Sequence, residues 1–396
     1  MKIIAILVNN ISVGGGFAQS LNAIVQMKNL SKNSFEFSVL SSDKSNLKVL
    51  EALKIDSFYL KPNFLDKLFA TFILTEIGYK FITRLKLLSS FEKRLKFEEC
   101  NLVYFLSPSS TMSLIQSINY MATVWDSSHR DSPEFDEVRS HGEFRTREYI
   151  YKNYLTQALI TLVDADISKK NLHIRYGLDK DKMLVMPFSP NPLLKKLEKT
   201  KQQKILEKYN IKTGYLFYPA QFWSHKNHIR VLQAIKILKD KKENINIVFS
   251  GGLQQNTNGY YNKILSYIEK SNLQNEVSIL GFVPSEDMSS LYSESSAVVF
   301  PSYLGPTNIP PLEAWSHDKP LLCSQLHEEQ VGKAAILFNP DDSEDIAKSI
   351  LKLKNEKIVD NLLLESKKQI LLINKKRENS EIILKSKLNS IKLRLD

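Results

Sequence analysis

The opening stretch KIIAILVNNISVGGGFAQSLNAIVQMKNL, residues 2–30, decides the fold class of this chain. An apolar run at 2–8 predicts a buried strand, three glycines at 14–16 predict a tight loop, and the apolar spacing at 21–30 predicts a helix. Because strand, glycine loop and helix in this order begin a βαβ unit, the pattern predicts an α/β protein with parallel sheets. A buried first strand also explains the opening run better than a signal peptide, since no cleavage pattern follows it.

The same rhythm continues in two series of β-like runs. The first series has runs at 2–8, 35–40, 101–106, 121–125, 158–163 and 183–188, and the second at 215–220, 245–250, 277–280, 297–300, 320–324 and 335–338. A chain of 396 residues exceeds the ~250–300 residues that one core usually serves, so two domains are expected. We expect a Rossmann-like domain at 1–190, a proline-rich and charged linker at 191–213, a second Rossmann-like domain at 214–374, and a helix at 375–396 that packs back on the first domain.

Composition narrows the partners of the chain. The 54 basic and 43 acidic residues give a net charge of +11, which favours an acidic partner such as nucleic acid, anionic lipid or a phosphorylated ligand. We expect no nucleic acid, because no aromatic-rich basic stripe or nucleic-acid motif occurs. Cys100 and Cys323 are far apart and lack metal-ligand spacing, and no run reaches the ~20 apolar residues of a membrane span. These features predict a cytoplasmic protein, either free or peripheral on the inner face of the plasma membrane.

Residues 64–97 mix apolar and basic side chains at helical spacing. The apolar positions include Leu68, Phe72, Ile77 and Phe81. The basic residues among them are Lys67, Lys80, Arg84, Lys86, Lys93, Arg94 and Lys96. Two interpretations of this basic amphipathic stretch remain open: packing on its own sheet with a solvated basic face, and adhesion to an anionic membrane surface.

Two groups of candidate site residues lie in the first series. Gly15 and Gly16 lack side chains, so backbone amides and the helix N-terminus could approach an anionic or hydroxylated ligand there. A tight turn without a ligand explains them equally well. Asp126 and His129 follow the strand expected at 121–125, and the carboxyl ends of strands are where open α/β sheets bind ligands. They could position sugar hydroxyls, assist a proton transfer or contact phosphate; an ordinary polar loop is the alternative.

The second series has two more candidate loops. In YPAQFWSHKNH, residues 218–228, Lys226 stands at the beginning of a helix, where a cation is unfavourable unless an anion binds beside it. In FPSYLGPTNIPPLEAW, residues 300–315, we expect a helix to start at Pro310 and to carry Glu313 in its first turn. A carboxylate at that position either suits the helix N-terminus or accepts both hydroxyls of a ribose.

Together these segments resemble the large family 4 of retaining glycosyltransferases, which have the GT-B fold of two Rossmann-like domains with parallel sheets facing across a cleft. The segment 218–228 is similar to the donor-phosphate loop of the family, Gly251 to its second glycine turn, and GFVPSEDMSSLY, residues 281–292, to its nucleotide-base loop. The wording GPTNIPPLEA, residues 305–314, resembles a branch associated with bacterial surface polysaccharides.

The resemblance implies site residues and a reaction. The implied donor-binding residues are Gly15, Gly16, Gln221, Lys226, Gly251, Phe282, Pro306, Thr307, Asn308, Ile309 and Glu313, and the catalytic ones are Asp126, His129 and Lys226. The implied reaction transfers a hexosyl group, with retention, from a nucleotide-diphosphate sugar to a saccharide or lipid-linked saccharide in O-antigen or capsule synthesis. It needs no metal ion and no other cofactor.

The chain departs from the family pattern at three places. Gln221 replaces the usual arginine of the donor-phosphate loop, Gly305 replaces the first of two glutamates, and Trp125 replaces the histidine of a His-Asp pair. These departures leave a non-catalytic sugar-binding homologue open. A nucleotide-sugar 2-epimerase of the same fold is the other enzyme class, and Gly305 disfavours it because an epimerase needs catalytic carboxylates around the donor sugar. The net charge of +11 prompts a further alternative, a nucleic-acid-binding module, which salt-dependent DNA binding would reveal.

Overall fold

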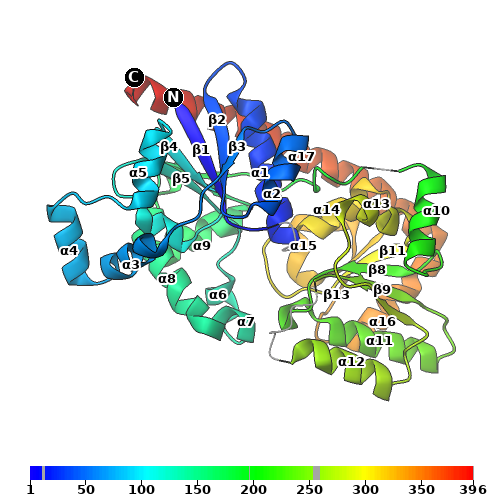
Figure 1. Ribbon diagram of the computed structural model, residues 1–396. Coiled ribbons are helices and arrows are strands. Elements are labelled where there is room, and N and C mark those ends of the chain that lie inside the picture. The colour runs from blue at the N-terminus through cyan, green and yellow to red at the C-terminus, as the bar shows by residue number, and fades with distance from the viewer. Residues whose placement is uncertain (11–13, 196, 253–258, 396) are drawn as a thin grey trace. The chain divides into compact units, whose positions relative to one another are not determined.

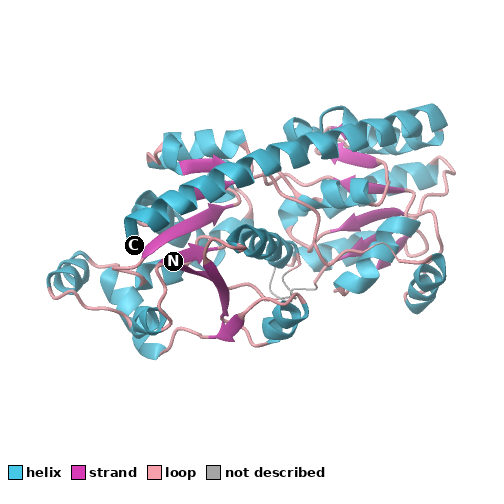
Figure 2. Ribbon diagram, turned by 90° about the horizontal axis from the view of Figure 1, so that it is seen from above, coloured by secondary structure: helices cyan, strands magenta, loops and turns pink. Residues whose placement is uncertain are grey.

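The computed structural model describes residues 1–10, 14–195, 197–252 and 259–395. They form two compact units, each built around one parallel sheet (Figure 1). Unit 1 comprises residues 1–131, 139–187 and 376–396, and unit 2 comprises residues 132–138 and 188–375. Figure 2 shows the strands of each unit lying between helices. The α/β fold class with two Rossmann-like units is confirmed.

The sheet of unit 1 contains, among the described residues, seven parallel strands in the order β3-β2-β1-β4-β5-β6-β7. They are β1 (Lys2–Leu7), β2 (Glu36–Ser41), β3 (Ser57–Tyr59), β4 (Leu102–Phe105), β5 (Asn119–Val124), β6 (Thr161–Val163) and β7 (Met183–Val185). β1 lies in the middle, paired with β2 and β4, and its residues 3–7 are buried. A strand covered on both faces has to be apolar at successive positions, which explains the unbroken run IIAIL.

The helices of unit 1 connect these strands. They are α1 (Gly15–Ser31), α2 (Ser45–Ala52), α3 (Phe64–Ile73), α4 (Glu76–Arg84), α5 (Ser90–Phe97), α6 (Ser128–Asp131), α8 (Glu143–Asn153) and α9 (Asp166–Tyr176). The stretch 64–97 is divided into three helices because Asn63, Thr75 and Ser89 each accept a backbone N–H three residues later as N-caps.

The sheet of unit 2 contains, in the described part of the chain, six parallel strands in the order β10-β9-β8-β11-β12-β13. They are β8 (Leu216–Pro219), β9 (Ile247–Ser250), β10 (Val277–Ile279), β11 (Ala297–Phe300), β12 (Leu321–Ser324) and β13 (Ile336–Phe338). The helices are α7 (Asp136–Arg139), α10 (Lys199–Lys208), α11 (His228–Asp240), α12 (Tyr260–Lys270), α13 (Ser285–Glu294), α14 (Ile309–Ser316), α15 (Glu328–Val331), α16 (Ser343–Leu351) and the first half of α17 (Glu356–Leu395).

Each unit is made of segments that are not consecutive in the chain, whereas each expected domain is one continuous segment. Residues 132–138 group with unit 2, although they lie within the expected domain 1–190. Within the expected linker 191–213, of which residue 196 is outside the described residues, α10 packs on α13 and the Lys208 ammonium pairs with Asp287 at 2.6 Å. Helix α17 contributes residues 356–375 to unit 2 and residues 376–396 to unit 1. In unit 1, Leu384 and Leu388 of this helix are fully buried.

Candidate functional site

The predicted site residues of unit 2 gather where its parallel strands end. The loop 220–227 follows β8, Gly251 follows β9, Phe282 follows β10, and the loop 301–308 follows β11. β8 pairs with both β9 and β11, so the loops after these three strands are neighbours. The carboxyl edge of a parallel sheet at the strand where the order reverses is the usual ligand-binding place of open α/β folds. Here that strand is β8.

Lys226 joins two of these loops. Its ammonium donates a hydrogen bond to Ser302 Oγ at 3.4 Å and lies 5.6 Å from the centre of the Phe300 ring. The Tyr303 N–H donates to the His225 carbonyl at 2.9 Å, and the buried Tyr218 hydroxyl donates to the Lys226 carbonyl at 2.7 Å. The loop backbone is therefore held, and the Lys226 cation stands two residues before the first residue of α11. A helix N-terminus and an ammonium at one place form an anion-binding arrangement.

Gln221 is engaged by its own loop. Its side-chain oxygen accepts a 2.6 Å hydrogen bond from the Trp223 indole, and its carbonyl accepts one from the Trp223 N–H at 2.8 Å. The resemblance described above has an arginine at this position. Here the Gln221 side-chain amide instead holds the Trp223 ring in place.

Gly251 is required by the close approach of two strand ends. A Cβ atom at this position would lie 2.1 Å from the Ala220 carbonyl oxygen. The backbone also donates from Gly251 to Gly281 at 2.8 Å. The glycine thus has a packing reason for being there, whether or not a ligand binds.

The loop after β11 is shaped by Gly305 and Asn308. Gly305 has φ +92°, a backbone conformation that a residue with a side chain rarely adopts. The Asn308 side chain donates to the Gly305 carbonyl at 3.2 Å, and its backbone exchanges two hydrogen bonds with the Gln330 amide, at 2.9 and 2.7 Å. Pro306 and Thr307 are half-buried between these fixed points, and Ile309 is buried.

Glu313 lies in the second turn of α14, because the helix begins at Ile309 rather than at Pro310. The expectation of a first-turn carboxylate is therefore wrong. Its side chain is 7% exposed and accepts a 2.5 Å hydrogen bond from the Tyr292 hydroxyl. Burial raises the pKa of Glu313 to about 7, although hydrogen bonds from Tyr292 and the Asn191 backbone oppose the rise. A buried carboxyl whose protonation changes near neutral pH ionises more readily when additional donors reach it.

Phe282 differs from the buried residues around it. Its ring is 46% exposed directly beyond β10. An exposed aromatic ring at a strand end offers a stacking surface to a planar ligand.

Residues 132–138 add a carboxylate to this edge that the sequence analysis missed. Glu137 accepts hydrogen bonds from Ser224 Oγ at 2.7 Å and from the His225 N–H at 2.9 Å, and it also pairs with the His225 ring. Burial alone would raise the pKa of Glu137, but the bonds from His225 and Ser224 lower it to about 2. The Phe135 ring packs on His225 and Tyr303. No local signal pointed to Glu137, because its partners lie 87 and 88 residues away.

The predicted site residues of unit 1 form a separate set. Gly14, with φ +65°, precedes the first residue of α1. Gly15 is exposed, Gly16 is half-buried, and a Cβ at Gly15 would meet no atom within 4 Å. The side-chain position of Gly15 is therefore open, which is compatible with a bound ligand and equally with a tight turn, so the donor-binding role of Gly15 and Gly16 stays a prediction.

Asp126 is held by an arginine that the sequence analysis missed. Its carboxylate accepts from Arg147 at 2.6 Å and from the Ser128 N–H at 2.8 Å. Burial alone would raise the pKa of Asp126, but the Arg147 guanidinium holds it well below its usual range. An ionised, partly exposed carboxylate can accept hydrogen bonds from sugar hydroxyls. Its low pKa makes it a poor proton acceptor near neutral pH.

His129 lies inside unit 1. Its side chain has no exposed surface, and Nε2 lies 3.0 Å from both Glu148 Oε1 and the Tyr176 hydroxyl. Burial lowers the pKa of His129 to about 4, so the ring is neutral at physiological pH. In this position His129 supports the loop that carries Asp126, and a direct role in catalysis stays a prediction.

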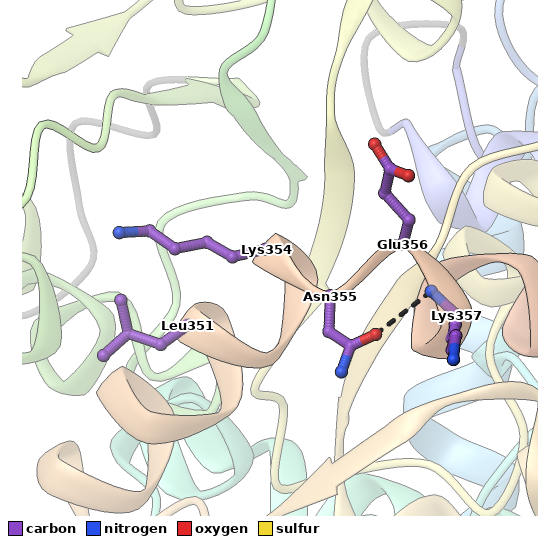
Figure 3. Close-up of a pocket in the computed structure, with 5 residues that line it drawn as sticks. All are labelled: Leu351, Lys354, Asn355, Glu356 and Lys357. Carbon is purple, nitrogen blue, oxygen red and sulfur yellow. Dashed lines mark hydrogen bonds between the residues drawn. The ribbon is translucent and has the colours of Figure 1, made fainter.

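One open pocket lies elsewhere in unit 2. It lies at the junction of α16 and α17 and is lined by Leu351, Lys354, Asn355, Glu356 and Lys357; Figure 3 shows the Lys354 and Glu356 side chains pointing in different directions. No predicted site residue lines it. Over the described ranges, no group of three or more His, Cys, Asp or Glu side chains is arranged to hold a metal ion. None of the helices described is long and apolar enough to span a membrane.

Residues 198–370 match the family of glycosyl transferases group 1. This region contains all the strand-end loops of unit 2 described above, from the Lys226 loop to Glu313. Solved structures are similar in fold to nearly the whole chain, among them WaaG, a glycosyltransferase involved in lipopolysaccharide biosynthesis, with a TM-score of 0.66 at 11% identity, over 97% of this chain and 99% of that one. Another of them, Alr3699/HepE of Anabaena in complex with UDP-glucose, superposes with a TM-score of 0.72 at 17% identity, over 98% of this chain and 100% of that one.

Two curated proteins with sequence similarity to this chain are O-antigen chain mannosyltransferases. The chain is 30% identical to the O-antigen chain mannosyltransferase B of Escherichia coli over 152 residues, which are 37% of this chain and 39% of that protein. It is 25% identical to the O-antigen chain mannosyltransferase RfbU of Salmonella typhimurium over 178 residues, 44% of this chain and 45% of that protein. The similarity thus spans less than half the length of each curated relative.

Proposed function

We propose that this chain is a retaining glycosyltransferase that moves a hexosyl group from a nucleotide-diphosphate sugar to a saccharide or lipid-linked saccharide in the synthesis of a bacterial surface polysaccharide. The observation that carries the proposal is the Lys226 ammonium beside the N-terminus of α11, within the region that matches group 1 glycosyltransferases. Both features favour a diphosphate at the carboxyl edge of the unit 2 sheet.

In this proposal unit 2 binds the donor. Lys226 and the backbone N–H groups of its loop take the diphosphate, Phe282 stacks on the base, and Glu313 accepts the ribose hydroxyls. The loop 305–309 surrounds the sugar. The buried hydrogen bonds from Tyr292 to Glu313 and from Tyr218 to the Lys226 carbonyl support this assignment, because they pre-organise both groups.

The proposed reaction needs neither a metal ion nor an enzyme nucleophile. The bond between the anomeric carbon and the β-phosphate oxygen breaks, the acceptor oxygen bonds to the same face of that carbon, and the leaving phosphate takes the acceptor proton. Lys226 stabilises the charge that develops on the phosphate. Asp126 orients hydroxyl groups, and Gly15 and Gly16 offer open backbone amides; both assignments are predictions.

The nature of the donor can be narrowed by experiment. Both curated relatives are mannosyltransferases, so GDP-mannose is the first donor to test, followed by UDP and ADP sugars. The measurement is the thermal stabilisation of the purified chain by each nucleotide sugar, followed by transfer to a saccharide acceptor and determination of the anomeric configuration of the product. Stabilisation without transfer or donor hydrolysis would indicate a non-catalytic homologue, and isomerised nucleotide sugar would indicate an epimerase. The absence of any stabilisation would contradict the proposal.

A further inference from the structure

Helices α3 and α4 bury one apolar face and expose another. Ile73 and Ile82 are 2% exposed and provide the inward contacts, so packing on unit 1 is already satisfied. The outward side chains are apolar as well: Ile77 is 78% exposed and Phe64 is 72% exposed. Figures 1 and 2 show α3 and α4 at the edge of unit 1, with α4 projecting outward. We call the outward side the α3–α4 face, whose exposed apolar residues include Phe64, Leu65, Leu68, Ile77, Tyr79 and Phe81.

Exposed apolar side chains on two helices that pack on each other are more than scattered single residues. Single exposed apolar residues are ordinary, but clustered ones mark interaction sites. A helix that packs on its own sheet has one apolar stripe and a polar outer face, which does not describe α4. The simple packing interpretation of residues 64–97 therefore accounts for Ile73 and Ile82 and leaves Ile77 unexplained.

The exposed charge of the whole stretch 64–97, which includes α5 as well as α3 and α4, is mostly basic because two of its three carboxylates are turned inward. Asp66 is 2% exposed and accepts hydrogen bonds from Ser90 Oγ at 2.6 Å and the Phe91 N–H at 3.0 Å. Glu92 has no exposed surface and accepts from the backbone N–H groups of residues 116–118 at 2.7–3.0 Å. Glu76 is the acidic residue of 64–97 that remains at the surface, paired with Lys80. All seven basic residues of the stretch are exposed.

We infer that the α3–α4 face docks on an anionic lipid surface. Apolar and aromatic side chains can enter the acyl boundary while lysines and arginines around them contact lipid phosphates, which is how short amphipathic helices bind at membranes. A second copy of the chain is a poor occupant, because two such basic faces repel each other. The inference rests on the proposed function only for its purpose, which is to bring the enzyme to a lipid-linked acceptor.

The test is co-sedimentation of the full chain with phosphatidylcholine vesicles that contain or lack phosphatidylglycerol. We expect binding to the anionic vesicles alone, weakened by salt. Ile77→Asn should weaken it about tenfold, whereas Ile174→Asn, at a 68% exposed position of α9, should leave it unchanged. Lys67→Gln with Arg84→Gln should weaken binding by about fivefold per charge. The matched pair Lys263→Gln with Lys270→Gln, both exposed on α12, should have no effect.

The outcomes separate this inference from the proposed function. Equal binding to neutral vesicles, or equal losses in the matched variants, would overturn it. Dimerisation or capture of an acidic peptide by the α3–α4 face, without vesicle binding, would also overturn it. Unaltered melting temperatures show that the variants fold. Thermal stabilisation by a nucleotide sugar, measured without lipid, tests the enzyme proposal independently, so either proposal can fail while the other stands.

Discussion

The Tyr292 hydroxyl donates a 2.5 Å hydrogen bond to Glu313 Oε2. The Tyr292 ring also stacks on His317, whose Nδ1 lies 2.8 Å from the Glu313 carbonyl oxygen and whose Nε2 lies 2.9 Å from Ser289 Oγ. Helices α13 and α14 thus hold one carboxyl group in a fixed position inside unit 2. Because burial outweighs the hydrogen bonds from Tyr292 and the Asn191 backbone, the pKa of the carboxyl is raised to about 7, and its protonation changes near physiological pH.

Glu313 makes the stability of the protein depend on pH in a defined direction. Below a pH of about 4.5, the pKa of Glu313 in the unfolded chain, the carboxyl is protonated in both the folded and the unfolded protein. Between that pH and about 7 the unfolded protein has lost this proton while the folded protein keeps it, so the free energy of unfolding falls as pH rises. The full loss is about 3 kcal/mol and is complete above pH 7. The measurement is the free energy of unfolding in urea at several pH values, for the wild type and for Glu313→Gln. The variant should not show the fall in this free energy between a pH of about 4.5 and 7. Glu286→Gln, an exposed carboxylate of α13, is the matched control. Parallel pH curves for wild type and Glu313→Gln would contradict the assignment.

Removal of the Lys226 ammonium should slow the chemical step. Lys226→Ala is expected to lower kcat at least ~100-fold, because one stabiliser of the charge developing on the leaving phosphate is lost. The measurement is steady-state turnover with the donor that the nucleotide-sugar panel identifies. Lys236→Ala, which removes a half-buried lysine paired with Asp240 on α11, is expected to leave turnover intact. An unchanged rate for Lys226→Ala would end its assignment to the diphosphate.

The Glu137 contact should control the mobility of residues 132–138. Glu137→Gln keeps the shape but weakens the charge-assisted bonds to Ser224 and His225, so hydrogen exchange should accelerate in residues 132–138 and 220–227. Glu134→Gln changes an exposed carboxylate of the same segment and should not alter the exchange. If both variants exchange alike, Glu137 is not the anchor.

Two glycines of the candidate site should respond differently to alanine. Gly251→Ala places a Cβ 2.1 Å from the Ala220 carbonyl oxygen, and such overpacking typically costs about 1–3 kcal/mol of stability. Gly15→Ala meets no atom within 4 Å and should fold normally, so any loss of activity would report a ligand at the start of α1. The comparison requires melting temperatures of both variants. Equal melting temperatures would refute the packing role of Gly251.

All the described strands except β3 could be predicted, because each of them lies in a nearly continuous apolar run. β3 was missed, since Ser57–Tyr59 has three residues and none is buried. Residues 64–97 were predicted as one helical stretch, although the caps Asn63, Thr75 and Ser89 were visible in the sequence. The membership of residues 132–138 in unit 2 could not be predicted, because it depends on contacts remote in sequence.

The loops of the candidate site could be located from the sequence more easily than the residues that contact them. Lys226 was singled out by its place between a strand and a helix, whereas Gly251 was assigned from the family resemblance. Glu137, Arg147 and Tyr292 were missed, because each acts on a predicted residue from another element. The burial of His129 was also unexpected, since a polar segment gives no sign of which side chain turns inward. Local pattern identifies strand ends, while the protonation of the groups there depends on tertiary packing.

Helix α17 has a consequence for how the protein is made. The first 187 residues leave the ribosome long before residues 376–396, which carry the buried Leu384 and Leu388 of unit 1. During synthesis the amino-terminal sheet therefore waits for its last covering helix, while unit 2 can complete its own sheet in the meantime. A nascent chain that stalls before this helix should be a substrate for chaperones and proteases, although most of its residues are already in place.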